Sequence, residues 1–144
     1  MMTAAGHDVI LIGSQRPAYT STMQPQLHLS LGVASLEESI DFFTRLLGAS
    51  VSHRDPSGYV NVDLCGAQVT LKQTADRLDA PPEFHFGVNM GLEQFDETAE
   101  RILADGRVRI IATPRVVDAG TSMERKKMYV RCPSGYVVEL KGYR

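Results

Sequence analysis

The 144-residue sequence predicts an α+β fold built from two tandem βαβββ units. Two strand-like segments of similar pattern open these units, a segment with helical periodicity follows each of them, and three short strand-like segments come after each helix. A chain of this length is expected to form one domain, so the repeat divides that domain into two half-size units. In such a unit the helix covers one face of the sheet and leaves the other face bare.

The first unit is predicted over residues 26–81. Its opening strand, residues 27–33, alternates large apolar residues with small or polar ones. A helix is predicted over residues 36–47, because apolar residues recur there at helical spacing, Ser35 provides an N-cap and Gly48 can end the helix in the left-handed conformation. The three strands that follow are predicted over residues 49–53, 59–64 and 67–72.

The second unit is predicted over residues 82–144 and repeats this order. A strand over residues 84–90 has the same alternation as the first strand, and a helix over residues 92–104 ends at Gly106. The three strands after this helix are predicted over residues 108–113, 127–131 and 136–140.

Residues 1–25 differ in composition from the rest of the chain, since they are rich in Ala, Thr, Ser, Gln and Pro. We predict an N-terminal arm there, with one strand-like stretch at residues 9–12. The sequence leaves open whether this arm is ordered against a partner subunit or loose.

The overall composition excludes several classes of protein. Fifteen Lys and Arg residues against seventeen Asp and Glu residues give a formal net charge of −2, which argues against a nucleic-acid-binding surface. The chain is 43% hydrophobic, as in globular proteins, and no apolar run reaches the roughly 20 residues of a membrane span. Cys65 and Cys132 are too few for a disulfide-stapled secreted scaffold. We therefore expect a cytoplasmic protein with no nucleic-acid or membrane partner.

Strand alternation predicts which residues lie on the bare faces of the two sheets. His28 and His85 occupy equivalent positions in the opening strands, and the large apolar residues beside them are expected to face the helices. Glu139 lies on the corresponding face of the last strand, where a buried carboxylate is costly unless it is paired or coordinates a cation. Two histidines and one carboxylate are a metal-binding set that suits Fe(II), Mn(II), Zn(II) or Co(II).

Three segments carry a resemblance to a known family. They are LHLSLGVASLEESIDFFTRLLGA around His28, FHFGVNMGLEQF around His85, and MYVRCPSGYVVELKGY, which ends in the strand of Glu139. Together with the repeat, they resemble the vicinal oxygen chelate (VOC) superfamily, which contains glyoxalase I, the fosfomycin and bleomycin resistance proteins and the extradiol dioxygenases. The resemblance covers about residues 26–144.

This resemblance implies a cup-shaped, half-open β-barrel formed from the two βαβββ modules. It makes His28, His85 and Glu139 the ligands of one divalent metal per site, with Fe(II) favoured and Mn(II), Zn(II) and Co(II) as alternatives. Family members of this size usually form homodimers, so we predict a homodimer with two sites. Two ways of building the sites are open. Either the two modules of one chain close on each other, or each site takes His28 from one chain and His85 and Glu139 from the other.

The resemblance favours some branches of the family over others. Glyoxalase I would have a further carboxylate where this chain has Thr70, which argues against that chemistry. Residues 129–139 follow the extradiol dioxygenase signature except at Cys132, and they make Tyr129 a candidate catalytic residue. The signature's upstream histidine would fall near residues 120–122, where the chain has none.

These observations lead to two hypotheses of different kinds. The first is a metal-dependent oxidoreductase, most like a small extradiol-type dioxygenase, with a glyoxalase-type or fosfomycin-type lyase or transferase as the alternative reaction. The candidate contacts to a substrate carboxylate are Arg131, Arg115 and Lys126. Each of them equally fits an ordinary charged residue of the surface. The second is a bleomycin-resistance-type protein that binds a small molecule without reaction. The presence of all three metal ligands favours the first.

Overall fold

The computed structural model describes residues 25–74 and 76–144 of the chain. The predicted arm therefore lies, except for Pro25, outside the described residues. The first module contains β1 (His28–Val33), α1 (Leu36–Asp41), the π-helix η1 (Phe42–Leu46), β2 (Ser50–Asp55), β3 (Tyr59–Leu64) and β4 (Ala67–Gln73). The second contains β5 (His85–Gly91), α2 (Leu92–Asp105), β6 (Arg109–Val117), β7 (Arg125–Arg131) and β8 (Val137–Tyr143). None of the described helices is long and apolar enough to span a membrane.

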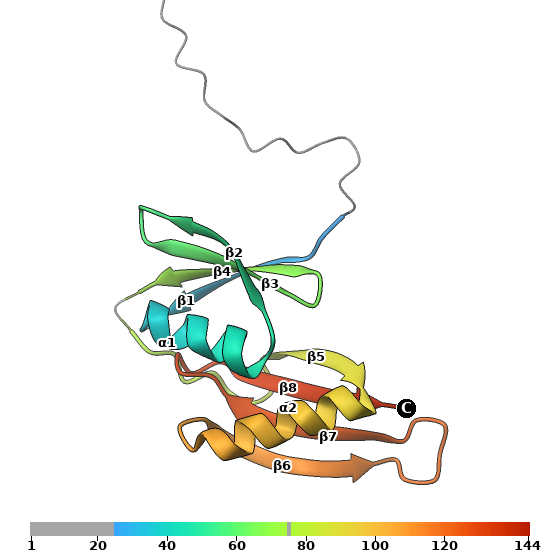
Figure 1. The fold of residues 1–144 in the computed structure, drawn as a ribbon. Helices are drawn as coiled ribbons and strands as arrows, with labels where there is room; N and C mark the ends of the chain where they lie inside the picture. The colour runs from blue at the N-terminus through green and yellow to red at the C-terminus, as the bar shows by residue number, and fades with distance from the viewer. Residues whose placement is uncertain (1–24, 75) are drawn as a thin grey trace, which may run out of the picture.

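Each module forms its own four-stranded mixed sheet (Figure 1). The strand orders are β1-β4-β3-β2 and β5-β8-β7-β6, so equivalent strands occupy equivalent places. In each sheet the first and last strands of the module run parallel, and the other neighbours run antiparallel. This arrangement confirms the predicted α+β fold of two tandem βαβββ modules.

Most strand bounds differ from the sequence-based expectation by one to three residues, and two elements differ more. The helix expected as one α-helix over residues 36–47 changes at Phe42 into the π-helix η1, whose Phe42, Phe43 and Leu46 are each only 1% exposed. All three side chains belong to the hydrophobic core. Strand β6 is longer than expected and continues past Pro114, which an edge strand tolerates because one side of its backbone has no strand partner.

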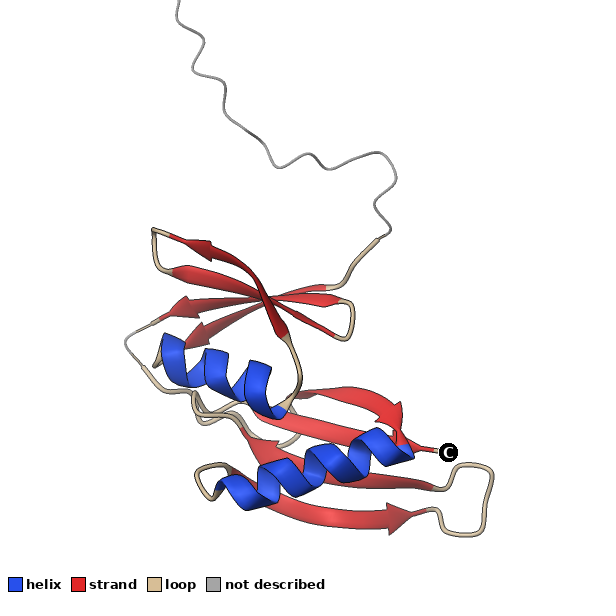
Figure 2. Ribbon diagram, viewed as in Figure 1, coloured by secondary structure: helices blue, strands red, loops and turns tan. Residues whose placement is uncertain are grey.

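The two modules share one hydrophobic core. Figures 1 and 2 show α1 between its own sheet and the second module. Phe43 of η1 stacks on Phe86 of β5, with ring centroids 6.2 Å apart and an interplanar angle of 9°. Buried residues of both sheets and both helices belong to the same cluster. Each helix therefore buries one face against this core, and the opposite faces of the two sheets remain uncovered by the helices.

The turn at residues 132–136 fastens the second module to the first. The buried Ser134 Oγ accepts a hydrogen bond from the Ala34 backbone N–H at 3.0 Å and lies 3.2 Å from Ser39 Oγ. The Tyr136 hydroxyl donates to the Gly32 carbonyl at 3.0 Å. These bonds join the end of β1 and the start of α1 to the turn that precedes β8.

The segment that links the modules packs directly against this turn. Leu78 N–H donates to the Ser134 carbonyl at 3.0 Å, and a Cβ at position 135 would lie 1.2 Å from the Leu78 carbonyl oxygen. Gly135 also has a φ of 96°, which favours glycine. The turn therefore requires glycine here for both its conformation and its contact with the linker.

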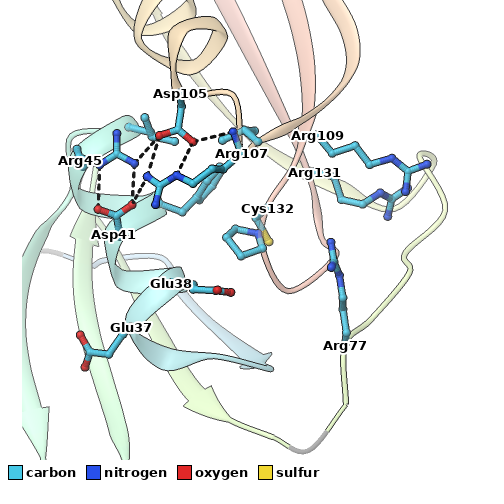
Figure 3. Close-up of a pocket in the computed structure, with 14 residues that line it drawn as sticks. Glu37, Glu38, Asp41, Arg45, Arg77, Asp105, Arg107, Arg109, Arg131 and Cys132 are labelled. Atoms are coloured by element: carbon cyan, nitrogen blue, oxygen red, sulfur yellow. Dashed lines mark hydrogen bonds and ion pairs between the residues drawn. The ribbon is translucent and has the colours of Figure 1, made fainter.

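A network of four charged side chains makes a second contact between the modules. Arg45 of η1 binds Asp41 and Asp105, each at 2.7 Å, and Arg107 binds Asp105 at 2.8 Å. The hydrogen bonds from Arg107 and Arg45 hold the pKa of Asp105 well below its usual range. A cleft of about 420 Å³ lies beside this network and is lined by α1, the end of α2 and the start of β6 (Figure 3).

The edges of the two sheets differ in regularity. At the outer edges, β2 and β6 contain register shifts, one between Val51 and His53 and two between Ile110 and Arg115. At the other edges, β1 and β5 pair with β4 and β8 without any shift. Bulges protect exposed strand edges against further pairing. Among the described strands, β1 and β5 are therefore the edges suited to accept another strand.

We predict that Ser134→Ala weakens the attachment between the modules. The substitution removes the acceptor of the Ala34 N–H and the partner of the Ser39 hydroxyl, which should lower the free energy of unfolding by about 1–3 kcal/mol. Urea denaturation followed by circular dichroism measures the change. The exposed Ser122, substituted in the same way, serves as the control, and an equal effect of both variants would contradict the prediction.

Candidate functional site

The uncovered face of the second sheet carries the polar side chains of interest. The strand β8 alternates as predicted: Val138 and Leu140 are fully buried in the core shared with α2, and Glu139 lies on the opposite face. On the neighbouring strand β7, Met128 and Val130 are buried in the same way, which leaves Lys127 and Tyr129 on the face of Glu139. The site is therefore built on adjacent sheet strands.

The carboxylate of Glu139 is the centre of this group. Glu139 is 5% exposed, and its Oε1 accepts a hydrogen bond from the Tyr129 hydroxyl at 2.5 Å. Lys127 Nζ lies 3.1 Å from Oε1, and Lys141 Nζ lies 3.2 Å from Oε2. Burial alone would raise the pKa of Glu139, but the hydrogen bonds from Tyr129, Lys127 and Lys141 outweigh it and lower the pKa to about 2. The carboxylate is thus ionised at any physiological pH.

The ring of His85 faces this carboxylate. Its Nδ1 lies 2.8 Å from the carbonyl oxygen of Pro82, which can only accept, so Nδ1 carries a proton and donates. Its Nε2 lies 3.2 Å from Glu139 Oε2. In a neutral ring the lone pair of Nε2 would face a carboxylate oxygen, and these two acceptors repel each other. A proton on Nε2 or a cation between the two atoms removes this repulsion.

Two further residues fix the geometry of His85 and Glu139. The Tyr129 ring meets the His85 ring edge to face, with centroids 5.6 Å apart, and the hydrogen bond to Glu139 raises the pKa of Tyr129, which stays protonated at neutral pH. Gly87 pairs with Glu139 in the parallel ladder, and a Cβ there would lie 2.2 Å from the Glu139 carbonyl oxygen. Glycine at this position therefore allows β5 to approach β8 beside the carboxylate.

The third predicted metal ligand lies in the other module. His28 begins β1, and its Nδ1 lies 3.1 Å from Gln68 Oε1 of β4. The described residues of the single chain contain no cluster of three His, Cys, Asp or Glu side chains with metal-binding spacing. The structure thus brings together His85, Glu139 and Tyr129 within one chain, and it does not bring His28 to them.

The chemistry of His85 and Glu139 fits a divalent metal. Ligand bonds of about 2.0–2.2 Å at right angles put two donor atoms about 3 Å apart, and Nε2 and Oε2 are 3.2 Å apart. A backbone carbonyl on the other ring nitrogen is the usual way to orient a metal-binding histidine. The ammonium group of Lys141 is the one feature that competes, because it contacts the same oxygen, Oε2.

At the positions equivalent to Glu139 and Tyr129, the first module has a neutral pair of side chains, Thr70 and Asn61. Thr70 is the register equivalent of Glu139, because it lies opposite Ser30 in β1 as Glu139 lies opposite Gly87 in β5. The Thr70 hydroxyl donates to Asn61 Oδ1 at 2.7 Å, in the place of the bond between Tyr129 and Glu139. Threonine and asparagine supply no anionic ligand, so the position equivalent to Glu139 is neutral in the first module.

The three predicted substrate contacts lie in different places. Arg115 of β6 lies directly opposite Lys127, on the uncovered face. Arg131 Nη1 donates to the carbonyls of Ala80 and Gly135, at 2.8 and 2.7 Å, and so holds the linker in place. Lys126 Nζ binds Asp96 of α2 at 2.7 Å, on the face that the helix covers. Only Arg115 of the three joins the group around Glu139.

Sequence reasoning missed Lys127 and Lys141 as members of the site. A signal was present, since each lies two residues from a predicted site residue in the same strand, Tyr129 or Glu139, and so shares its face. The Pro82 carbonyl carried no such signal, because a backbone acceptor has no side-chain identity and its position depends on the path of the linker.

Comparisons with known proteins agree on the fold. Residues 26–140 match the model of the Glyoxalase/Bleomycin resistance protein/Dioxygenase superfamily. A search of curated protein sequences gives no match.

Several solved structures share this fold at low sequence identity. A glyoxalase/bleomycin resistance protein/dioxygenase from Alicyclobacillus acidocaldarius is 21% identical, with a TM-score of 0.68 over 83% of this chain and 91% of that one. TioX from Micromonospora sp. ML1 is 18% identical, with a TM-score of 0.64 over 84% of this chain and 100% of that one. The fosfomycin resistance protein FosX from Listeria monocytogenes, complexed with Mn(II) and sulfate ion, is 18% identical, with a TM-score of 0.65 over 85% and 94%.

The family match extends over most of the chain and includes the strands of His28, His85 and Glu139. Two modules of identical strand order, with one carboxylate and one histidine converging on the uncovered face of the second, agree with it. The chain belongs to the Glyoxalase/Bleomycin resistance protein/Dioxygenase superfamily, the vicinal oxygen chelate proteins.

Proposed function

We propose that the protein is a homodimeric, divalent-metal-dependent enzyme whose small-molecule substrate chelates the metal through vicinal oxygens. The observation that carries this proposal is the pairing of His85 with Glu139. The Pro82 carbonyl leaves Nε2 of His85 as the free ring nitrogen, and this atom faces an ionised carboxylate oxygen at 3.2 Å. A metal ion satisfies both atoms at once, as described above.

In this proposal His28, His85 and Glu139 bind the metal. When bound, a divalent ion supplies Lewis-acid chemistry, and iron adds the activation of O₂. Fe(II) remains the favoured ion, with Mn(II), Zn(II) and Co(II) as alternatives; a FosX structure contains Mn(II). Tyr129 keeps its proton, orients the Glu139 carboxylate and offers its hydroxyl oxygen to a substrate beside the metal site.

The edges of the sheets support a homodimer. If β1 of one chain lies beside β5 of the other, each four-stranded sheet is extended to eight strands and the exposed edge is removed. Leu27 and Phe84, at equivalent places before β1 and β5, are 72% and 75% exposed in the single chain. In a twofold dimer both are near the new junction, and His28 of one chain comes to the face that carries His85 and Glu139 of the other.

The reaction we propose is of the extradiol dioxygenase type, because residues 129–139 keep Tyr129 and Glu139 at the spacing of that signature. The chain has no histidine at residues 118–124, the loop between β6 and β7, so this route must use another acid or base. A lyase or transferase reaction of the glyoxalase or fosfomycin type is the alternative.

One observation favours a second function, a binding protein without catalysis. Lys127 and Lys141 already neutralise Glu139, so the carboxylate is stable without a metal. A protein of this kind would bind its ligand equally well after complete removal of metal.

We predict that the wild-type protein, purified without oxygen, retains about one divalent ion per chain, and that His85→Ala lowers this content at least tenfold. Elemental analysis of both proteins measures the content and identifies the ion. His53→Ala is the matched control, because His53 lies in the first module and contacts Asp55. A metal-free wild type, or equal metal content in His85→Ala and wild type, would contradict the proposal.

A mixing experiment tests whether each site is shared between two chains. His28→Ala and Glu139→Gln each remove a ligand from every site, so neither variant alone should retain metal. In an equal mixture that is unfolded and refolded together, half of the dimers contain both chains and have one intact site of two. We expect the mixture to regain about a quarter of the wild-type metal content. A site built within one chain predicts no recovery, and a monomeric mass in sedimentation excludes the dimer.

The low pKa of Glu139 predicts a pH dependence of stability. Because folding lowers this pKa from 4.5 to about 2, the ionised carboxylate stabilises the fold above pH 4.5, and this contribution is lost as the pH falls from 4.5 toward 2. Tyr129→Phe removes one of the bonds that lower the pKa, so its unfolding free energy should fall less steeply than that of wild type over this range. Urea denaturation at several pH values measures both slopes, with Tyr143→Phe as the control. Identical slopes in wild type and Tyr129→Phe would show that Tyr129 does not lower the pKa.

A further inference from the structure

Three cationic side chains form a row across the uncovered face of the second sheet. Arg115 of β6 lies directly opposite Lys127 of β7, and Lys127 lies directly opposite Lys141 of β8. Like charges at directly opposite positions of an antiparallel pair repel each other. We call Arg115, Lys127 and Lys141 the cationic row. A row of this kind costs stability unless anions compensate it.

The anionic groups around the cationic row do not balance it. Lys127 and Lys141 both contact Glu139, at 3.1 and 3.2 Å, and Arg115 has no ion pair with any described residue. The three cations of the row thus have one carboxylate partner, which contacts only Lys127 and Lys141. The side chains of Lys127 and Lys141 are only 18% and 28% exposed, so bulk water screens their charges less than it screens those of extended surface lysines.

The first module provides an internal comparison. At the register positions equivalent to Lys141, Lys127 and Arg115, it has Lys72, Tyr59 and Asp55. That row contains one cation and one anion and is therefore balanced. The excess of positive charge is specific to the module that carries Glu139 and is not a general property of the repeated fold.

We propose that the cationic row binds an oxyanion group of the substrate, a carboxylate or a phosphoryl group, beside Glu139. This inference rests on the proposed function, since it names the substrate class of the same site. Asn89 of β5, the register partner of Lys141, extends the row with an amide that can donate to the same group. The substrate is then an anion whose charged group lies next to its chelating oxygens.

The proposal also accounts for the position of Lys141. When its ammonium group turns from Glu139 Oε2 to the bound oxyanion, that oxygen becomes free for the metal. The metal and the anion then bind with positive coupling, and each raises the affinity of the site for the other.

Calorimetric titration of the full chain with inorganic phosphate, and separately with malonate, at constant ionic strength tests the cationic row. We expect saturable binding of at least one of these anions, and the one that binds more tightly identifies the group that the row prefers. Lys127→Met and Lys141→Met should weaken binding at least tenfold, whereas Lys127→Arg should retain it. Lys126→Met is the matched control, because it removes the same charge from the neighbouring position, on the helix-covered face. Circular dichroism checks that each variant is folded.

Two results would overturn the proposal that the cationic row binds an oxyanion. One is no saturable binding of either anion by the wild type, and the other is equal weakening of anion binding by Lys126→Met and Lys127→Met. The same titration after treatment with EDTA separates this inference from the proposed function. Weaker binding after metal removal supports the coupling. If the wild-type protein as purified contains no stoichiometric metal and still binds the anion, the cationic row is upheld and the metal-dependent enzyme is rejected.

Discussion

The turn at residues 132–136 is the constraint on which the rest of the structure depends. Through Ser134 and Tyr136 it holds the first module, and through Gly135 it holds the linker. The strand β8 starts directly after this turn, so the same contacts that fasten the modules also position Glu139. Because the linker is held there too, the Pro82 carbonyl lies where it can orient His85. A structural turn thus sets the geometry of the candidate site at its edge.

The arrangement of the modules explains why one chain has only part of the predicted metal site. The two modules pack through their helices and a shared core, so the uncovered sheet faces do not close on each other. Each module brings its own histidine to its own sheet, but a carboxylate stands at the last-strand position only in the second, as Glu139, where the first has Thr70. The pair of Thr70 and Asn61 preserves the hydrogen bond of the repeat without the charge, so Glu139 has no anionic counterpart at the equivalent position of the first module.

The sequence was sufficient for the fold and for the face on which the site lies, because both follow from periodicity. The repeat predicted two βαβββ modules, and strand alternation put Glu139 and Tyr129 on one side of the sheet. Alternation does not say which strands are neighbours, so the contact of Glu139 with His85 required the parallel pairing of β5 with β8. It also does not say where a long side chain ends. Arg131 and Lys126 were predicted as substrate contacts from their charge, but Arg131 donates to the carbonyls of Ala80 and Gly135 and Lys126 binds Asp96. Ala80 and Asp96 come from distant parts of the sequence.

The regular edges of β1 and β5 have a consequence for how the protein is made. A newly folded chain presents two straight strand edges and two exposed apolar side chains, Leu27 and Phe84, at the same time. Such edges accept any suitable strand, including those of unrelated chains. If like chains cover them, assembly is second order in chain concentration, while capture by other proteins depends on their concentration instead. The yield of correctly assembled protein would then rise with expression level.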